Sequence, residues 1–232
     1  MLSKRLEEVY KRVPEGARVA DIGCDHAYLP IELVKTGRAS FALGCDLNRG
    51  PLDAARQNAW RMGIKEDKLT LRLGNGLAPV AAGEVDTVTI AGMGAGLMRD
   101  ILEASPEVVK ALKRSVVSPN IAPWLLRSWA VENQFAVVEE TVVFEGGHYY
   151  ETFVMVPSAD AVHYSDLELY FGVQLYDAND AKVLNYYKSR KEGDQRLFKA
   201  WEEVRKTRED VAQKYDTLQS LWMRWEEEHP CK

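Results

Sequence analysis

The residues best suited to chemistry lie in the stretch DIGCDHAYLP at positions 21–30, directly after a short apolar run. Gly23 lets the backbone approach a ligand because glycine has no Cβ atom. A dinucleotide-binding fingerprint would need a second glycine where this chain has Asp25. A carboxylate would repel a diphosphate, so the loop argues against NAD and FAD. It favours a cofactor with a cationic amino-acid end, such as S-adenosylmethionine, and we assign Asp21 and Gly23 to cofactor binding.

Asp46 lies at the end of a second apolar run. A carboxylate at this place can accept hydrogen bonds from the two hydroxyl groups of a ribose. The simpler alternative is an aspartate that caps the following helix. We favour the ribose role and expect the neighbouring Leu47 to contact the cofactor as well.

Two glycine-containing loops follow the third and fourth apolar runs. In the first, Asn75 can donate to and accept from an adenine edge, although Asn-Gly is also a common turn. In the second, Gly92 allows close approach of the backbone and Met93 can pack against a cofactor, although a tight turn would need the same glycines. We expect cofactor contacts from Asn75, Gly76, Gly92 and Met93.

The tripeptide Ser118-Pro119-Asn120 ends a fifth apolar run. A carbonyl group before proline and an asparagine amide can both hold an adenine edge, and amino-methylating enzymes often present such groups to a base. Ligands of open α/β sheets bind where the carboxyl ends of parallel strands meet. We therefore expect Asn120 to lie near Asp25 and His26, and we assign these three residues to catalysis.

The elements that would position these residues alternate along the chain. Short apolar runs predict strands, and the periodic segments between them predict helices. This alternation indicates a parallel sheet with helices on both faces, and two final β-rich segments indicate an antiparallel hairpin. The layout is that of a Rossmann-like methyltransferase sheet, in the α/β class. The expected strands are 17–22, 40–46, 69–73, 85–91, 114–119, 135–144 and 149–157, and the expected helices are 28–36, 50–63, 95–104, 106–113 and 122–133.

The sequence from about residue 179 onward has no proline before Pro230 and a single glycine. Its apolar residues recur at a seven-residue step, which predicts a helical hairpin or coiled coil. We expect two antiparallel helices joined near 205–209, where the segment from Thr207 to Asp210 fits a capping box. Residues 182–208 hold nine Lys or Arg against four Asp or Glu, which suits a solvated helix face or phosphate contacts. The apolar positions are Val183, Leu197, Val204, Val211, Leu218 and Trp225.

Composition limits the remaining classes of protein. The 232 residues carry a net charge of −5 and are 46% hydrophobic, which is typical of a globular domain with an appended segment. No apolar run is long enough to predict a membrane span, and the amphipathic start does not resemble a signal peptide. Three widely spaced cysteines indicate reduced thiols in a cytoplasmic protein. Neither metal-ligand spacing nor a hydrolase GxSxG elbow is present, so we expect no metal.

Several segments together resemble the bacterial TrmK family in order and spacing. This resemblance implies a tRNA methyltransferase that transfers the methyl group of S-adenosylmethionine to N1 of adenine 22. It also implies a methyltransferase domain over 1–157 and an antiparallel coiled-coil domain over 158–232. The chain departs from the family at Asn75, where aspartate is usual, at Ser118, where glutamine is usual, and at Gly172-Val173, where Gly-Pro is usual. The segments are DIGCDHAYLP at 21–30, CDLNRGPLDAARQN at 45–58, GNGL at 74–77, IAGMGAGLM at 90–98, SPNIAPWLLRSWA at 118–130 and EGGHYYE at 145–151.

The implied reaction suggests roles for two of the loop residues. Methylation at N1 leaves a cationic base, which the Asp25 carboxylate could stabilise, with His26 as its hydrogen-bond partner or as a proton acceptor. In the other interpretation Asp25 binds the ammonium group of the cofactor and His26 is structural. We expect a monomer whose partner is tRNA, with no membrane association. Two other classes stay open: a methyltransferase acting on another RNA or a small molecule, and a non-catalytic interaction protein.

Overall fold

A computed structural model describes residues 2–176 and 180–230. The chain divides into two compact units, Met1–His163 and Tyr164–Lys232. Among the helices of the described residues, none is both long and apolar enough to cross a membrane.

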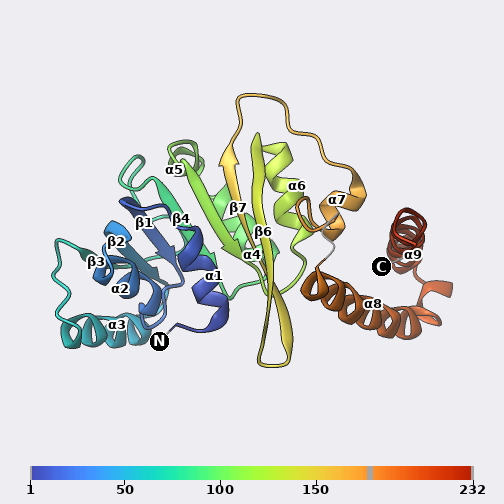
Figure 1. Ribbon diagram of the computed structural model, residues 1–232, viewed down its shortest axis with the longest axis horizontal. Helices are drawn as coiled ribbons and strands as arrows, with labels where there is room; N and C mark the ends of the chain where they lie inside the picture. The colour runs from blue at the N-terminus through green and yellow to red at the C-terminus, as the bar shows by residue number, and fades with distance from the viewer. Residues whose placement is uncertain (1, 177–179, 231–232) are drawn as a thin grey trace. The chain divides into compact units, whose positions relative to one another are not determined.

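The first unit is built on a seven-stranded sheet with the order β3-β2-β1-β4-β5-β7-β6 (Figure 1). Its first five strands are parallel, and β7 lies between β5 and β6 and runs antiparallel to both. The prediction of a parallel sheet followed by a hairpin is therefore confirmed. The strands are β1 Ala17–Ile22, β2 Ala39–Asp46, β3 Leu69–Leu73, β4 Thr87–Ala91, β5 Arg114–Ser118, β6 Phe135–Glu145 and β7 His148–Pro157.

Helices connect β1 to β2, β2 to β3 and β4 to β5, and they cover both faces of the sheet (Figure 1). Residues of α1 and α2 share one apolar cluster with β1, β5 and β7, and residues of α2 and α3 share a second with β2 and β3. α3 closes at Gly63, which has a φ of +68°, as the sequence predicts for a residue just past a helix. The helices are α1 Lys4–Arg12, α2 Tyr28–Lys35, α3 Arg49–Arg61, α4 Ala95–Glu103, α5 Pro106–Lys110 and α6 Trp124–Glu132.

The second unit contains α7 Asp166–Phe171, α8 Ala181–Trp201, the 3₁₀ turn η1 Val204–Lys206 and α9 Glu209–Glu228. The helices α8 and α9 run antiparallel. The ring of Phe198 contacts that of Tyr215, and further along the pair the Trp222 indole donates to Asp194 at 2.9 Å. The prediction of two antiparallel helices that reverse near 205–209 is confirmed by these contacts.

Two details predicted for this unit are wrong. Leu197 and Val204, assigned to the apolar seven-residue series, are 42% and 40% exposed. The core of this unit lies elsewhere and includes α7, which supplies Phe171, whose ring contacts those of Tyr187, Trp222 and Trp225. The predicted capping box at 207–210 is absent, since Arg208 is the N-cap of α9 and makes no side-chain cap bond. A capping box forms instead at the start of α7, between Ser165 and Glu168.

Candidate active site

The loop after β1 has an unusual backbone. Gly23, Asp25 and Ala27 all have positive φ values, of 72°, 49° and 56°. Aspartate tolerates the left-handed region better than most residues with a Cβ, whereas alanine is strained there. Asp25 thus occupies a position where glycine is more usual, and its backbone has the left-handed conformation that glycine would adopt there.

The N–H groups of this loop are used within the protein. Gly23 and Cys24 both donate to the Cys45 carbonyl oxygen, at 2.8 and 3.0 Å. The Asp25 N–H donates to Asp46 Oδ2 at 3.1 Å. A diphosphate-binding loop would instead present such N–H groups to the anion. The geometry therefore supports the sequence argument against a dinucleotide.

Gly23 also brings the loops after β1 and β4 together. A Cβ atom at this position would lie 2.3 Å from Met93 Cε, so the flexible Met93 side chain would have to move away. The Met93 side chain therefore packs over the backbone of Gly23. Two residues that the sequence assigns separately to cofactor binding are direct neighbours in the fold.

Asp46 is buried at the end of β2, and both of its carboxylate oxygens accept a backbone hydrogen bond. Oδ2 accepts from Asp25 and Oδ1 accepts from the Asn48 N–H at 2.9 Å. Asn48 is the N-cap of α3, so part of the helix-capping alternative is present in the structure. Each oxygen keeps a lone pair, since a carboxylate oxygen can accept two bonds. Hydrogen bonding to a diol is compatible with this arrangement.

Asp21 is buried beneath the same edge. Removal from water raises the pKa of Asp21 from 3.8 to about 7, and the charge of Asp46 adds to this rise. The hydrogen bond that Thr89 Oγ1 donates to Asp21 Oδ1 at 2.6 Å opposes the rise. Burial, together with the charges of Asp21 and Asp46, also raises the pKa of the Cys24 thiol, and burial raises the pKa of Cys45 to about 12. Both cysteines are buried and free.

The side chains of Asp25 and His26 are exposed, at 67% and 44% of their surface. His26 Nε2 lies 3.6 Å from Asp25 Oδ1, too far for a hydrogen bond but close enough for an ion pair when the imidazole is protonated. The amide of Asn58 on α3 donates to the His26 carbonyl oxygen at 3.1 Å and anchors the loop. The structure therefore places the two predicted catalytic side chains next to each other and open to solvent.

Asn120 joins the loops after β4 and β5. Its N–H donates to the Met93 carbonyl oxygen at 2.8 Å, and its Nδ2 donates to the Gly92 carbonyl oxygen at 2.7 Å. Its Oδ1 accepts from Arg5 Nη1 at 2.7 Å. The predicted residues Gly92, Met93 and Asn120 thus form one connected cluster, and Arg5 is a member that sequence reasoning missed.

Three predicted cofactor residues have weaker structural support. Asn75 is exposed on the loop after β3, which is tied to the site because the Gly74 N–H donates to the Asp46 carbonyl oxygen at 2.9 Å. A Cβ atom on Gly76, whose φ is +55°, would lie 2.9 Å from Ile101, so close packing alone already requires this glycine. Leu47 is 65% exposed beside Asp46. Ile121 is exposed as well, directly after Asn120, and it was not predicted from the sequence.

The chain is similar to known methyltransferases. Residues 2–153 match the methyltransferase-domain family. Over 172 residues the chain is 36% identical to the tRNA (adenine(22)-N(1))-methyltransferase of Bacillus subtilis, covering 74% of this chain and 72% of that protein. The chain belongs to the TrmK family of methyltransferases.

Solved structures of TrmK proteins agree with the fold. The B. subtilis m1A22 tRNA methyltransferase TrmK is 29% identical, with a TM-score of 0.82 over 95% of this chain and 98% of that one. A putative tRNA (m1A22) methyltransferase of Streptococcus pneumoniae, in complex with S-adenosyl-L-methionine, is 31% identical, with a TM-score of 0.80 over 95% of this chain and 99% of that one. The TrmK likeness therefore extends over both units, including the helical one.

Proposed function

We propose that this protein transfers the methyl group of S-adenosylmethionine to N1 of adenine 22 in tRNA. The observation that carries the proposal is the loop after β1, whose N–H groups are bonded internally while the side chain of Asp25 faces solvent. Such a loop suits a cationic ligand and not a diphosphate. The choice of adenine 22 in tRNA as the substrate is based on the TrmK relatives named above.

The residues at the sheet edge fit the cofactor. Asp46 would accept hydrogen bonds from the ribose hydroxyls with its remaining lone pairs, and Leu47 and Met93 would provide apolar contact. Asn75 and Gly76 would border the adenine, Gly92 would line the site with its backbone, and Asp21 and Gly23 would form its floor. S-adenosylmethionine supplies a methyl group bound to a sulfonium sulfur. After transfer this sulfur is part of a neutral thioether, which is the leaving group.

The chain itself has to position the target base. N1 of adenine carries a free lone pair at neutral pH, so no proton needs to be removed before attack. The new N1–carbon bond forms as the carbon–sulfur bond breaks, and the electron pair of that bond stays on sulfur. Holding the reactants in line can supply about 7–11 kcal/mol. We assign the base contact to Asn120, whose amide keeps one donor and one acceptor after its bonds to Gly92 and Arg5.

Asp25 would stabilise the cationic product, because its carboxylate is exposed at the edge where the base must enter. His26 would hold that carboxylate in place or accept a proton from the exocyclic amine. In the competing role Asp25 binds the ammonium group of the cofactor. The two roles differ in which constant changes when the carboxylate is removed.

The helical unit would bind the RNA backbone. Four basic residues of α8 are exposed, and three of them take part in no ion pair found among residues 180–230; these three are Lys188, Arg196 and Lys199. Phosphate neutralisation by such residues dominates the affinity for nucleic acid. In this proposal residues 1–157 form the cofactor-binding domain and residues 158–232 a coiled-coil RNA-binding domain of a cytoplasmic monomer.

The decisive assay uses unmodified tRNA, labelled S-adenosylmethionine and nucleoside analysis. We expect 1-methyladenosine at position 22, seen as a stop in primer extension, and no product when position 22 is guanosine. Label in a different position or in a small molecule would overturn the assignment. Light scattering on the purified protein would test the monomer.

A further inference from the structure

Arg5 of α1 reaches the candidate site from an element that precedes the sheet. Its Nη1 donates to Asn120 Oδ1 at 2.7 Å, and its guanidinium carbon lies 4.8 Å from the centre of the Tyr150 ring. A Cβ atom on Gly92 would lie 3.4 Å from Arg5 Nη2. The guanidinium therefore occupies the space where the loops after β4 and β5 meet β7.

The bonds of the Asn120 amide leave it a single orientation. Oδ1 accepts from Arg5, and Nδ2 donates to the Gly92 carbonyl oxygen. Rotating the amide by half a turn would place Nδ2 against the positive guanidinium and Oδ1 against a carbonyl oxygen, and both contacts are repulsive. Gly92 alone disfavours the wrong orientation through one neutral bond, whereas Arg5 adds a charge-assisted bond, which is the stronger type.

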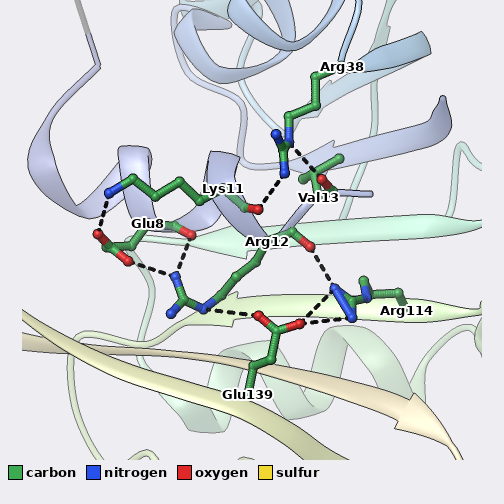
Figure 2. A network of polar contacts seen from close by, with 7 residues as sticks. All are labelled: Glu8, Lys11, Arg12, Val13, Arg38, Arg114 and Glu139. Carbon is green, nitrogen blue, oxygen red and sulfur yellow. Dashed lines mark hydrogen bonds and ion pairs between the residues drawn. The ribbon is translucent and has the colours of Figure 1, made fainter. Parts of the chain in front are cut away.

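Polar contacts at its other end hold α1 in place. Figure 2 shows that Arg38 donates to the carbonyl oxygens of Lys11 and Val13, at 2.6 and 2.7 Å. Arg114, the first residue of β5, donates to the Arg12 carbonyl oxygen at 2.9 Å and to Glu139 at 3.0 Å. These cations satisfy carbonyl groups that a helix C-terminus leaves unpaired. The end of α1 far from the site is thereby anchored to the starts of β2 and β5.

Apolar packing fixes the rotation of α1 about its own axis. Val9 and Val13 are fully buried in a cluster with Val116 of β5 and Val154 of β7, and Leu6 packs against the same cluster. Buried residues on one side of a helix determine where the remaining side chains point. Arg5 is thus placed beside Asn120 by the body of the helix.

We propose that Arg5 is a positioning residue for methyl transfer, which fixes the Asn120 carboxamide so that its remaining acceptor and donor are presented to the target adenine. The proposal rests on the proposed function, in which Asn120 contacts the base. It predicts that loss of Arg5 affects the reaction of bound tRNA more than it affects the binding of S-adenosylmethionine.

The test compares Arg5→Ala, Asn120→Ala and the double variant in full-length protein, with tRNA as substrate. We expect Arg5→Ala to lower kcat about tenfold, as loss of a charge-assisted bond would, while the Kd for S-adenosylmethionine changes less than about twofold in calorimetry. In the Asn120→Ala background the same substitution should cause no further loss, because the two residues act as a unit. Arg5→Lys keeps a charged donor and should lose less activity than Arg5→Ala.

Arg12→Ala provides the matched control, since it removes the arginine that bonds Glu8 and faces Glu139 at the opposite end of the same helix. It should lower the Tm at least as much as Arg5→Ala does and leave kcat unchanged. Additive losses in the double variant, an unchanged kcat in Arg5→Ala, or an equal loss in Arg12→Ala would overturn the positioning role. Failure of the wild-type protein to methylate adenine 22 would instead overturn the proposed function.

Discussion

The sheet unit and the helical unit differ in how closely their sequence pattern follows their structure. In the sheet unit the predicted central strands β4 and β5 are buried at all but one residue each, because helices cover both of their faces. In the helical unit a regular seven-residue pattern contains two exposed members, Leu197 and Val204. A helical periodicity in the sequence shows which residues share one face of a helix, but it does not show how much of that face a neighbouring helix covers.

The two units also differ in where their polar groups lie. The sheet unit buries Asp21 and Asp46 at the candidate site, whereas α8 presents cations to solvent. We expect changes in one unit to affect cofactor binding and rate, and changes in the other to affect RNA affinity. The following experiments test that division.

The largest effect is expected from Phe171→Ala in the helical unit. Phe171 is fully buried and contacts Tyr170, Tyr187, Trp222 and Trp225. Truncating a buried phenylalanine costs about 3–5 kcal/mol, so this unit should unfold at a lower temperature, as followed by circular dichroism. Leu197→Ala, at a position that the seven-residue pattern assigns to the core, should cost less than about 0.5 kcal/mol. Equal destabilisation by both would restore the simple coiled-coil interpretation.

Asp25→Asn tests the sheet unit. We expect kcat to fall about 100-fold, the size of loss seen when one preorganised electrostatic contact is removed, and the Kd for S-adenosylmethionine to stay within about twofold. Asparagine also tolerates the left-handed backbone, so the loop should keep its shape. Asp53→Asn, an exposed carboxylate on α3, is the control and should leave both constants unchanged. A selective loss of cofactor affinity would assign Asp25 to the ammonium group instead.

A smaller effect is expected from removing three of the exposed cations of α8, Lys188, Arg196 and Lys199, as a triple alanine variant. Affinity for tRNA should fall about tenfold, and the dependence of log Kd on log salt should become shallower by about one unit for each phosphate that is no longer neutralised. Binding of S-adenosylmethionine should not change. The same substitution of Lys110 and Lys113, beside the start of β5, is the control. An unchanged salt slope in the triple variant would argue against phosphate binding by α8.

The smallest effect is a pH dependence of stability from Asp21. Its pKa is about 7 in the folded protein and 3.8 in an unperturbed carboxyl group, so the folded state binds more protons between these values. The contribution of Asp21 to stability is therefore present below about pH 4 and is lost as the pH rises through 7. Asp21→Asn, which can still accept from Thr89, should show a drop in Tm between about pH 5 and pH 7.5 that is a few degrees smaller than in the wild type. Parallel pH profiles would contradict the raised pKa.

Much of the site could be predicted because its residues follow buried strands. Gly23, Asp46, Gly92 and Asn120 each lie within a few residues of a strand end, and parallel strands bring those ends to one edge. Arg5 could not be found this way, because it lies on a helix that precedes the sheet, 115 residues from Asn120, the residue that it bonds. Nothing in its local sequence distinguishes it from the other cations of that helix.

By itself the sequence determined the order of the elements, the loop with Asp25 in place of a glycine, and the likeness to TrmK. These features depend on local periodicity and on residue type at turns. Only the tertiary structure decided that Met93 covers Gly23, that Arg5 orients Asn120, and that Phe171 completes the helical core. Each of these contacts joins residues that are far apart in the chain. Such contacts depend on side-chain shape and burial in the folded protein, and no local sequence pattern encodes them.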